Sequence, residues 1–482
     1  MPESPSTLEP DLLRPTYHFT AQRNWINDPN GLVYFQGEYH LCYQYNPLGN
    51  IHRNMSWGHA VSTDLLHWRE LEVAIPIEAG VEAFSGGAVV DWRNSSGFGL
   101  GDAPPLVAAF TGHHTGKHLQ DQRLAFSNDH GRTWTRYSSN PVLDIGESDF
   151  RDPKVFWHAA TGRWVMLLVL AHEFKIQFYS SSDLKTWEFL SDFGPAGSSA
   201  GIWEVPELLE LPIAGSSESR WMLKVDLGAG GPCGGSAGQY FIGQFDGTRF
   251  TADPASLETA PNWINGGKDF YAAVAWSDAP DGQIVWIGWM NNWQYASQLP
   301  TSPWRGAMTL PRTLELRRTA SGHRLVQRPI PQLETLRTNH QQRTDLRLEG
   351  RLMLGASSTA LEIKLRVALQ EAAGFVLELG RHARVGFDAA THELYVERDA
   401  AEFSADFGGR HSSIVPLENG ILELRIFIDA CSVEVFADDG ACVITDLLMH
   451  PFEPSEIALV SSVGALRVVK LDFWTLERDG LV

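Results

Sequence analysis

The heptapeptide Ser62-Thr63-Asp64-Leu65-Leu66-His67-Trp68 carries a hydroxyl, a carboxylate two positions later and an aromatic side chain at its end. The Ser-x-Asp pattern with a following tryptophan recurs at residues 127–134 and 181–187, so successive copies begin 65 and 54 residues apart. Phe245-Asp246-Gly247 with Phe250 is a degraded fourth copy. Serine and aspartate side chains bond to the backbone of tight turns. A turn-plus-aromatic signal at this spacing predicts the blades of a β-propeller, a little longer than the roughly 40 to 50 residues of common propeller repeats.

Short β-rich segments surround these turns and are separated by clusters of Gly, Asn, Asp and Pro. No long stretch has the 3.6-residue apolar period of an amphipathic helix. The sequence therefore predicts an all-β protein. The clearest predicted strands are 39–45, 106–110, 164–170, 176–179, 221–225, 240–245 and 284–289.

The chain is long enough for two hydrophobic cores, because 482 residues exceed what one core usually serves. Residues 331–344 are polar and poor in strand formers, which indicates a linker. Beyond them, runs of alternating apolar residues predict antiparallel strands packed as a sandwich. We therefore expect a propeller domain over residues 1–330, a linker over 331–344 and a β-sandwich domain over 345–482.

Composition excludes some classes of partner. The chain has 58 acidic and 38 basic residues and a formal charge of -20, which argues against nucleic acid or an anionic membrane as a partner. A neutral small molecule or oligosaccharide would be indifferent to this charge. No apolar run approaches the 18 or so residues of a membrane span, and the first residues lack a signal-peptide pattern. The sequence as given thus predicts a cytoplasmic protein, although a trimmed secreted protein would look the same. Oligomerisation stays open.

The segment Trp25-Ile26-Asn27-Asp28-Pro29-Asn30-Gly31 is the first candidate for chemistry. Pro29 fixes its own φ and pushes Asp28 into an extended conformation, while Gly31 permits a turn. A carboxylate held by stiff neighbours suits a nucleophile, whose oxygen must be aimed before the substrate arrives. The alternative is a turn aspartate that bonds only to its own backbone.

Two further acids, Asp152 and Glu204, lie in comparable contexts. In Phe150-Arg151-Asp152-Pro153 the proline restricts the backbone of Asp152, and Arg151 offers a cation that keeps the carboxylate ionised. Glu204 lies between Trp203 and Val205, where apolar neighbours would favour its protonated form. The alternatives are a weak surface ion pair for the first and a solvent-facing strand residue for the second.

These segments together resemble the signature of glycoside hydrolase family 32, which comprises invertases, inulinases and levanases. The resemblance covers roughly residues 17 to 315. It implies a five-bladed propeller followed by a β-sandwich. We expect no cofactor and no metal. The matching stretches, in the order of the family, are Trp25–Gly31, Trp57–Ala60 with Ser62 and Asp64, Phe84–Gly86, Phe150–Pro153, Trp203–Pro206, Asp269–Ala272, and Trp304–Gly306 running to Pro311–Arg312.

The resemblance also implies a division of roles among the three acids. Asp28 would be the nucleophile that forms a fructosyl-enzyme, and Glu204 the general acid/base. Asp152 would stabilise the transition state through the fructosyl hydroxyls. Such a pair suits an oxocarbenium-like transition state, which needs one protonated and one ionised carboxyl group. Retention of configuration follows.

A furanose ring is held by hydrogen-bonding side chains and by aromatic walls. Asp269, by its position in a motif, either reaches the site or belongs to a turn. His113 and His114 show no metal-ligand spacing, so we expect them to be surface loop residues. For the tryptophans, core packing is the alternative. The nominated binding residues are Asn27, Gln44, Trp57, Phe84, Ser85, Arg151 and Trp293.

Two departures from the family pattern bear on the subfamily and the pH optimum: Val205 stands where the family usually has cysteine, and Gly87 where it has serine. The segment Trp289–Tyr295 is similar to that of exo-acting inulinases and levanases. We therefore expect an exo-acting β-fructofuranosidase that releases fructose from sucrose and from fructans such as inulin and levan. The alternatives are a fructosyltransferase, a non-catalytic sugar-binding propeller, and an inverting arabinan-type hydrolase on a similar propeller.

Overall fold

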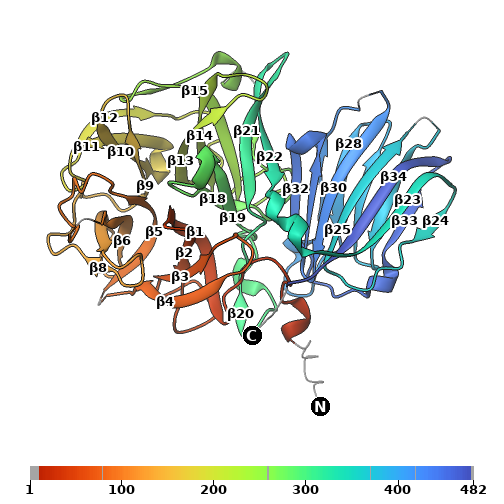
Figure 1. The fold of residues 1–482 in the computed structure, drawn as a ribbon, viewed down its shortest axis with the longest axis horizontal. Coiled ribbons are helices and arrows are strands. Elements are labelled where there is room, and N and C mark those ends of the chain that lie inside the picture. The colour runs from red at the N-terminus through yellow and green to blue at the C-terminus, as the bar shows by residue number, and fades with distance from the viewer. Residues whose placement is uncertain are drawn as a thin grey trace.

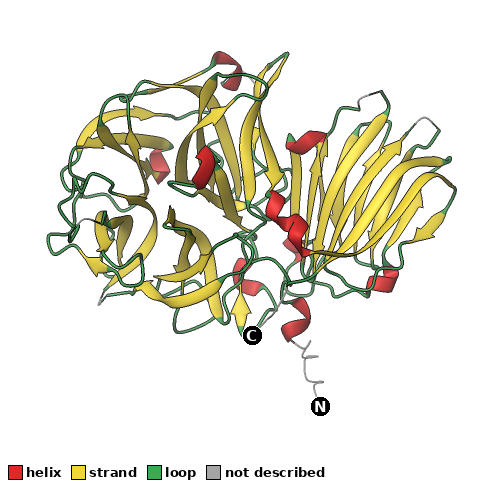
Figure 2. Ribbon diagram, viewed as in Figure 1, coloured by secondary structure: helices red, strands yellow, loops and turns green. Residues whose placement is uncertain are grey.

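The computed structural model describes residues 10–478 except 79, 102, 258, 259, 370 and 418. Five sheets follow one another along the first two thirds of the chain, and their innermost strands surround a common centre (Figure 1). These strands are β1 (Asn24–Phe35), β5 (Val81–Val90), β9 (Phe150–His158), β13 (Trp203–Pro212) and β18 (Tyr271–Ala275). Strands and loops make up nearly the whole molecule (Figure 2). The fold is thus the expected all-β propeller followed by a sandwich.

Each blade is a sheet of consecutive strands, which orders the blades around the ring. Blade 1 comprises β1 (Asn24–Phe35), β2 (Glu38–Tyr45), β3 (Ser56–Ser62) and β4 (Arg69–Ile75). Blade 2 comprises β5 (Val81–Val90), β6 (Leu106–His114), β7 (Gln120–Ser127) and β8 (Thr135–Arg136). Blade 3 comprises β9 (Phe150–His158), β10 (Arg163–Leu170), β11 (Lys175–Ser181) and β12 (Glu188–Phe193).

The last two blades complete the ring. Strand β20, from the segment between the strands of blade 5, pairs in parallel with the start of β1 and so joins the fifth blade to the first. Blade 4 comprises β13 (Trp203–Pro212), β14 (Ser219–Leu227), β15 (Ala237–Phe245), β16 (Phe250–Ala252) and β17 (Asn262–Trp263). Blade 5 comprises β18 (Tyr271–Ala275), β19 (Val285–Trp289), β21 (Arg312–Thr319) and β22 (Gly322–Pro329), whereas β20 (Trp304–Arg305) belongs to the sheet of blade 1.

The repeated Ser-x-Asp turn connects the third and fourth strands of blades 1 to 3. In the first copy the Ser62 hydroxyl donates to the Asp64 carboxylate over 2.9 Å, and the Trp68 indole donates to the Leu65 carbonyl over 3.1 Å. The other two copies repeat both bonds. The degraded fourth copy keeps its aspartate, since Asp246 accepts from two backbone amides of the turn that follows β15. The repeat predicted from sequence is confirmed.

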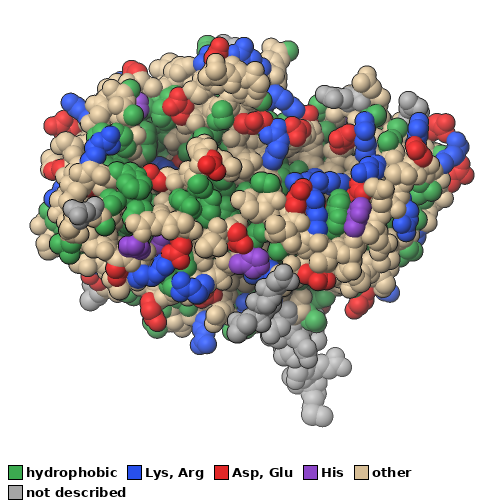
Figure 3. Space-filling view, in the orientation of Figure 1, with side chains coloured by type: hydrophobic (Ala, Val, Ile, Leu, Met, Phe, Trp, Pro, Cys, Tyr) green, Lys and Arg blue, Asp and Glu red, His purple; other side chains and the backbone are tan. Residues whose placement is uncertain are grey.

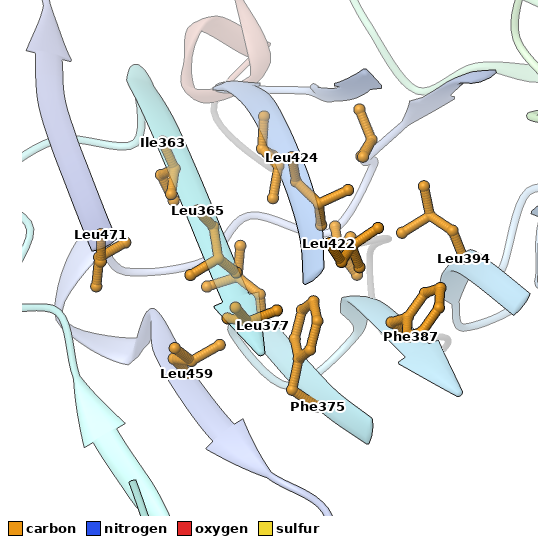
Figure 4. Packing of buried hydrophobic residues seen from close by; sticks show 14 of the residues in the cluster. Ile363, Leu365, Phe375, Leu377, Phe387, Leu394, Leu422, Leu424, Leu459 and Leu471 are labelled. Carbon is orange, nitrogen blue, oxygen red and sulfur yellow. The ribbon is translucent and has the colours of Figure 1, made fainter. Parts of the chain in front are cut away.

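The sandwich packs two six-stranded sheets face to face (Figure 1). Leucine, isoleucine and phenylalanine side chains of both sheets meet between them (Figure 4). One sheet has the order β23 (Arg337–Leu348), β34 (Leu466–Leu476), β25 (Leu361–Ala368), β30 (Ile421–Asp429), β31 (Ser432–Ala437), β32 (Cys442–Leu447). The other has the order β24 (Arg351–Met353), β33 (Ala458–Ser461), β26 (Gly374–Leu379), β27 (Ala383–Asp388), β28 (Glu393–Arg398), β29 (Gly409–Ile414).

The structure corrects the secondary structure expected for residues 331–344. The 3-10 helix η6 (Pro331–Leu336) follows the last propeller strand directly, and Arg337 begins β23. This strand lies at the edge of its sheet, where polar side chains face solvent, so its composition resembles that of a linker. The other 3-10 helices are η1 (Pro10–Leu13), η2 (Ala171–Glu173), η3 (Pro254–Ser256), η4 (Pro280–Gly282), η5 (Ala296–Gln298), η7 (Ala405–Phe407), η8 (Asp438–Gly440) and η9 (Pro454–Glu456).

Buried ionic groups join the sandwich to the propeller. His18, which precedes β1, bonds to Asp429 over 2.8 Å and to Glu434 over 2.9 Å, and all three side chains are fully buried. Arg312 of β21 also bonds to Glu434. The four cysteines are free thiols. On the propeller face drawn in Figure 3, hydrophobic side chains gather around a central hollow.

Candidate active site

The innermost strand of every blade carries the same irregularity at a similar depth: two of its residues oppose a single residue of the second strand. In blade 1, Asn27 and Asp28 oppose Gln44. In blade 2, Phe84 and Ser85 oppose Thr111. Such β-bulges re-aim side chains and occur next to active sites. The corresponding pairs are Asp152 and Pro153 in blade 3, Val205 and Pro206 in blade 4, and Ala272 and Ala273 in blade 5.

Most of the residues nominated from sequence lie in these bulges or directly beside them. Asn27, Asp28, Phe84, Ser85 and Asp152 are bulged residues. Gln44 lies opposite a bulge. Arg151 and Glu204 are the residues that come directly before one. The five bulges therefore gather side chains that are far apart in sequence at one level of the central channel.

The bulges depend on unusual backbone conformations. Asp152 has a φ of 63° and Val205 a φ of 47°, although L residues avoid this region and β-branched ones most of all. The proline that follows Asp152 therefore does not hold this residue in the extended region. Conformations of this kind cost of order 1–3 kcal/mol each and persist where the surroundings enforce them.

Asp28 lies on the floor of the site and is 8% exposed. Its Oδ2 accepts from the Ser85 hydroxyl over 2.7 Å, and its Oδ1 accepts from the Asn27 amide over 3.1 Å. The Trp25 indole in turn donates to Asn27 over 2.7 Å, which fixes the amide. Burial raises the pKa of Asp28 to about 6, against the lowering effect of the Ser85 hydrogen bond. The carboxylate is thus ionised at neutral pH, as expected, but with little margin.

Asp152 is equally buried, at 6% exposed. Its Oδ2 accepts from the Val205 amide over 2.9 Å, and its own amide donates to the Thr111 hydroxyl over 3.0 Å. Burial raises the pKa of Asp152 to about 7, although the Arg151 guanidinium lowers it. The carboxylates of Asp28 and Glu204 raise it further, which places all three acids within electrostatic reach of one another.

Glu204 lies nearer the mouth of the site, because 20% of its side chain is exposed. Its Oε1 accepts from Arg151 Nη2 over 3.2 Å, and its Oε2 accepts from the Tyr271 hydroxyl. The expectation of an apolar environment is wrong. The flanking Trp203 and Val205 side chains are buried in hydrophobic clusters, so they do not surround the carboxylate.

Arg151 ties the acids together and is 6% exposed. Besides Glu204, its guanidinium donates to Asp149 over 2.7 Å and to Gln120 over 3.3 Å, and it lies 3.9 Å from Asp152. Burial alone would lower its pKa, but the nearby carboxylates outweigh this and raise it. A fixed cation therefore stands between two of the acids.

Aromatic rings stand around these groups. Trp293 stacks on Trp25 with centroids 6.1 Å apart, and its ring is 5.3 Å from that of His52. Phe84 stacks on His113 at 4.4 Å. His113 is thus a neighbour of the site, so its assignment as an ordinary surface loop residue is wrong. Phe84 and Trp293 are both half-buried, so each keeps part of its surface for a ligand.

Two other nominated residues support the site from within. Trp57 is 1% exposed, packs in the core and donates to the Phe84 carbonyl over 2.9 Å. A Cβ on Gly31 would lie 2.6 Å from its ring, so glycine is required there. Gln44 donates to the Ala83 carbonyl over 2.9 Å. Both side chains brace the bulge of blade 2.

The sequence left open whether Asp269 reaches the site or belongs to a turn, and in the structure it has neither role. Its carboxylate accepts from Arg398 over 2.6 Å and from the Leu447 amide over 2.8 Å, and it also bonds to the Tyr295 hydroxyl. Both Arg398 and Leu447 belong to the sandwich. Asp269 therefore anchors the sandwich to blade 5.

Sequence reasoning missed three residues close to the acids: Tyr271, Lys224 and Asp226. Tyr271 lies within a matching motif, but nothing in the spacing connects it with Glu204, which is 67 positions away. Lys224 and Asp226 alternate with apolar residues on β14, a pattern typical of a strand with one side in solvent, although both side chains are buried. Beyond the acids, the inner strands enclose a cavity of about 20 Å³, room for roughly one water molecule.

Comparison with known proteins agrees with this architecture. Residues 18–329 match the glycosyl hydrolases family 32 N-terminal domain, and residues 332–475 match the family 32 C terminal. A levanase of Bacillus subtilis is 44% identical over 96% of this chain and 70% of its own length. An extracellular exo-inulinase of Aspergillus ficuum is 37% identical over 95% of this chain and 94% of its own.

Solved structures agree as well. The exo-inulinase of Aspergillus awamori superposes with a TM-score of 0.91 at 35% identity and covers 96% of this chain and 98% of its own. A fructofuranosidase of Schwanniomyces occidentalis complexed with fructose gives 0.88 at 30% identity, with the same coverage. With both family models matched in order over almost its whole length, this chain belongs to glycosyl hydrolase family 32.

Proposed function

We propose that this protein is a retaining, exo-acting β-fructofuranosidase that removes terminal β-D-fructosyl residues from sucrose and from fructans. The observation that carries the proposal is the convergence of Asp28, Asp152 and Glu204, which lie in or directly before the bulges of three different blades and interact electrostatically with one another. The relatives named levanase, exo-inulinase and fructofuranosidase support the choice of substrate.

In the first step, Asp28 attacks the anomeric carbon C2 of the fructosyl unit while Glu204 donates a proton to the glycosidic oxygen. The C2–O bond breaks, the alcohol leaves, and an ester forms between Asp28 and C2. Asn27 and Ser85 hold the two oxygens of Asp28, so the attacking group is oriented before the substrate arrives.

In the second step, Glu204, now a carboxylate, takes a proton from water, and the resulting hydroxide attacks C2 from the side that the leaving group vacated. The ester bond breaks and Asp28 is regenerated. The greater exposure of Glu204 supports this assignment, since the acid/base has to meet both the leaving alcohol and the incoming water, whereas the nucleophile does not.

Asp152 and Arg151 act on the sugar rather than on the bond that breaks. Asp152 accepts hydrogen bonds from fructosyl hydroxyls, which strengthen as positive charge develops on the ring. Asn27, Gln44, Ser85 and Arg151 are almost fully buried. The relatives named exo-inulinase support exo-action.

The test is sugar release from sucrose, inulin and levan, with the products separated by size. Asp28→Ala and Glu204→Gln are expected to lose fructose release by at least a thousandfold while still binding fructose. Glu210→Gln, which changes an exposed carboxylate on the same strand as Glu204, is the matched control and keeps wild-type rates. A wild-type protein that binds fructose but never hydrolyses would refute the proposal. Oligosaccharides longer than the substrate at high sucrose would indicate a fructosyltransferase instead.

A further inference from the structure

An ionic pair lies directly behind the acids and has no part in the steps above. Lys224 and Asp226 of β14 are 0% and 1% exposed, and the ammonium bonds to the carboxylate. Lys224 Nζ also donates to the Val205 carbonyl over 3.0 Å. Replacing a buried pair by apolar side chains of similar size is often neutral or stabilising, so stability alone gives no reason for this pair.

The position of the pair in the sheet is specific. Glu204 pairs with Asp226 and Glu207 with Lys224, so the two charged residues bracket the bulge formed by Val205 and Pro206. The residues that bracket the bulge in the other four blades are aromatic, aliphatic or glycine: Tyr43 and Tyr45, Phe110 and Gly112, Leu167 and Val169, Ile287 and Trp289. Blade 4 differs from them, and it is the blade that carries Glu204.

The bulge of blade 4 is held by hydrogen bonds to both backbone polar groups of Val205. The Val205 amide donates to Asp152, and the Val205 carbonyl accepts from Lys224. Val205 has a φ of 47°, which a β-branched residue adopts only under constraint. The hydrogen bond from Lys224 supplies that constraint. It keeps the Val205 amide directed at Asp152 and the Glu204 carboxylate directed into the site.

We propose that Lys224 and Asp226 are positioning residues of the hydrolase site: Lys224 locks the left-handed turn at Val205, and Asp226 balances its charge beneath the three acids. This inference rests on the proposed function, since it concerns the same reaction. Without Lys224 the turn would relax toward an ordinary strand, Glu204 would lose its aim, and Asp152 would lose its backbone donor.

Titratable groups on three of the inner strands interact electrostatically with the pair: Asp28 on β1, Glu204 and Glu207 on β13, and Tyr271 on β18. Glu207 is itself paired with Lys154 of β9. Lys224 lowers the pKa of Asp28, although burial dominates that value. Asp28 and Glu204 in turn raise the pKa of Asp226, whose largest contribution is again burial. The pair therefore acts on the acids through charge as well as through geometry.

The test separates these two effects. The double variant Lys224→Met/Asp226→Leu removes both charges and leaves no buried ion unpaired, so it is expected to fold. We expect its kcat on sucrose to fall about tenfold to a hundredfold, its KM to stay within about threefold, and the acid limb of its pH profile to move little. Asp226→Asn leaves the cation unbalanced near Asp28, so the acid limb is expected to move to lower pH.

Arg398→Met/Asp269→Leu is the matched control, because it removes another buried pair, 2.6 Å apart, whose arginine donates to the Leu447 carbonyl instead of Val205. It is expected to keep kcat within about threefold. Equal losses in both double variants would overturn the inference, and so would wild-type kcat in Lys224→Met/Asp226→Leu or an unmoved acid limb in Asp226→Asn. A wild-type protein without fructose release would instead refute the proposed function itself.

Discussion

Replacing Ser85 by alanine tests the idea that the nucleophile is kept ionised by one short hydrogen bond. The Ser85 hydroxyl donates to Asp28 Oδ2 over 2.7 Å and counters the burial that raises the pKa of Asp28 to about 6. Ser85→Ala removes this donor and adds no bulk. We expect the pKa of Asp28 to rise and the active, ionised fraction to shrink at acidic pH.

The size of the effect follows from the charge of the acceptor. A hydrogen bond to a charged group contributes about 1.5–3 kcal/mol, and 1.36 kcal/mol corresponds to one pKa unit. The acid limb of the kcat/KM profile, which reports groups of the free enzyme, should therefore move up by roughly one to two pH units. Because the site acids interact, the limb belongs to the cluster as a whole.

The assay is initial-rate fructose release from sucrose between pH 4 and 8. Ser180→Ala is the matched control, because Ser180 is a buried serine of blade 3 whose hydroxyl has no hydrogen-bond partner. Its profile should superimpose on that of the wild type. If Ser85→Ala lowers kcat/KM by the same factor at every pH, Ser85 serves only to hold substrate, and the electrostatic reasoning is refuted.

Four other variants test the energetics of the site and of its support. Asp28→Asn should raise the free energy of unfolding at pH 7 by up to about 3 kcal/mol. Burial raises the pKa of Asp28, so the wild type loses stability as pH rises from 3.8 to about 6 and the neutral asparagine does not. Equal melting temperatures of the two proteins at pH 7 would contradict this. His18→Gln should destabilise by a similar amount at pH 6. Burial lowers the pKa of His18, but its two carboxylate hydrogen bonds raise it to about 9, so the stabilisation is complete below 6.5 and is lost as pH rises through 9; a stability gap that persists at pH 10 would count against it. Arg398→Met should cost about 3–5 kcal/mol in urea denaturation by leaving Asp269 buried without its cation, while the folded fraction keeps wild-type kcat. Val205→Cys is expected to move the basic limb of the pH profile to lower pH, and superimposed profiles would show that the residue beside Glu204 does not set it.

The sequence by itself determined the all-β class and the blade repeat, and it nominated the three acids that the structure brings together. These features depend on local chemistry. A Ser-x-Asp turn bonds within its own few residues, so its three copies could be recognised and their geometry anticipated. Asp-Pro and Asn-Gly steps likewise mark backbone irregularities without reference to the rest of the chain.

Only the tertiary structure decided what surrounds those acids. The Glu204 carboxylate bonds to Arg151 and Tyr271, which are 53 and 67 positions away in the sequence, whereas the side chains next to it in the sequence pack into the core. Asp269 lies in a motif, yet it bonds to the sandwich because the blade 5 segment faces that domain. The strand at 337–348 could not be recognised from its composition, because a strand at the exposed edge of a sheet can be polar throughout. Contacts between blades depend on where each bulge turns its side chains, and a bulge is a property of two paired strands that one strand's sequence does not contain.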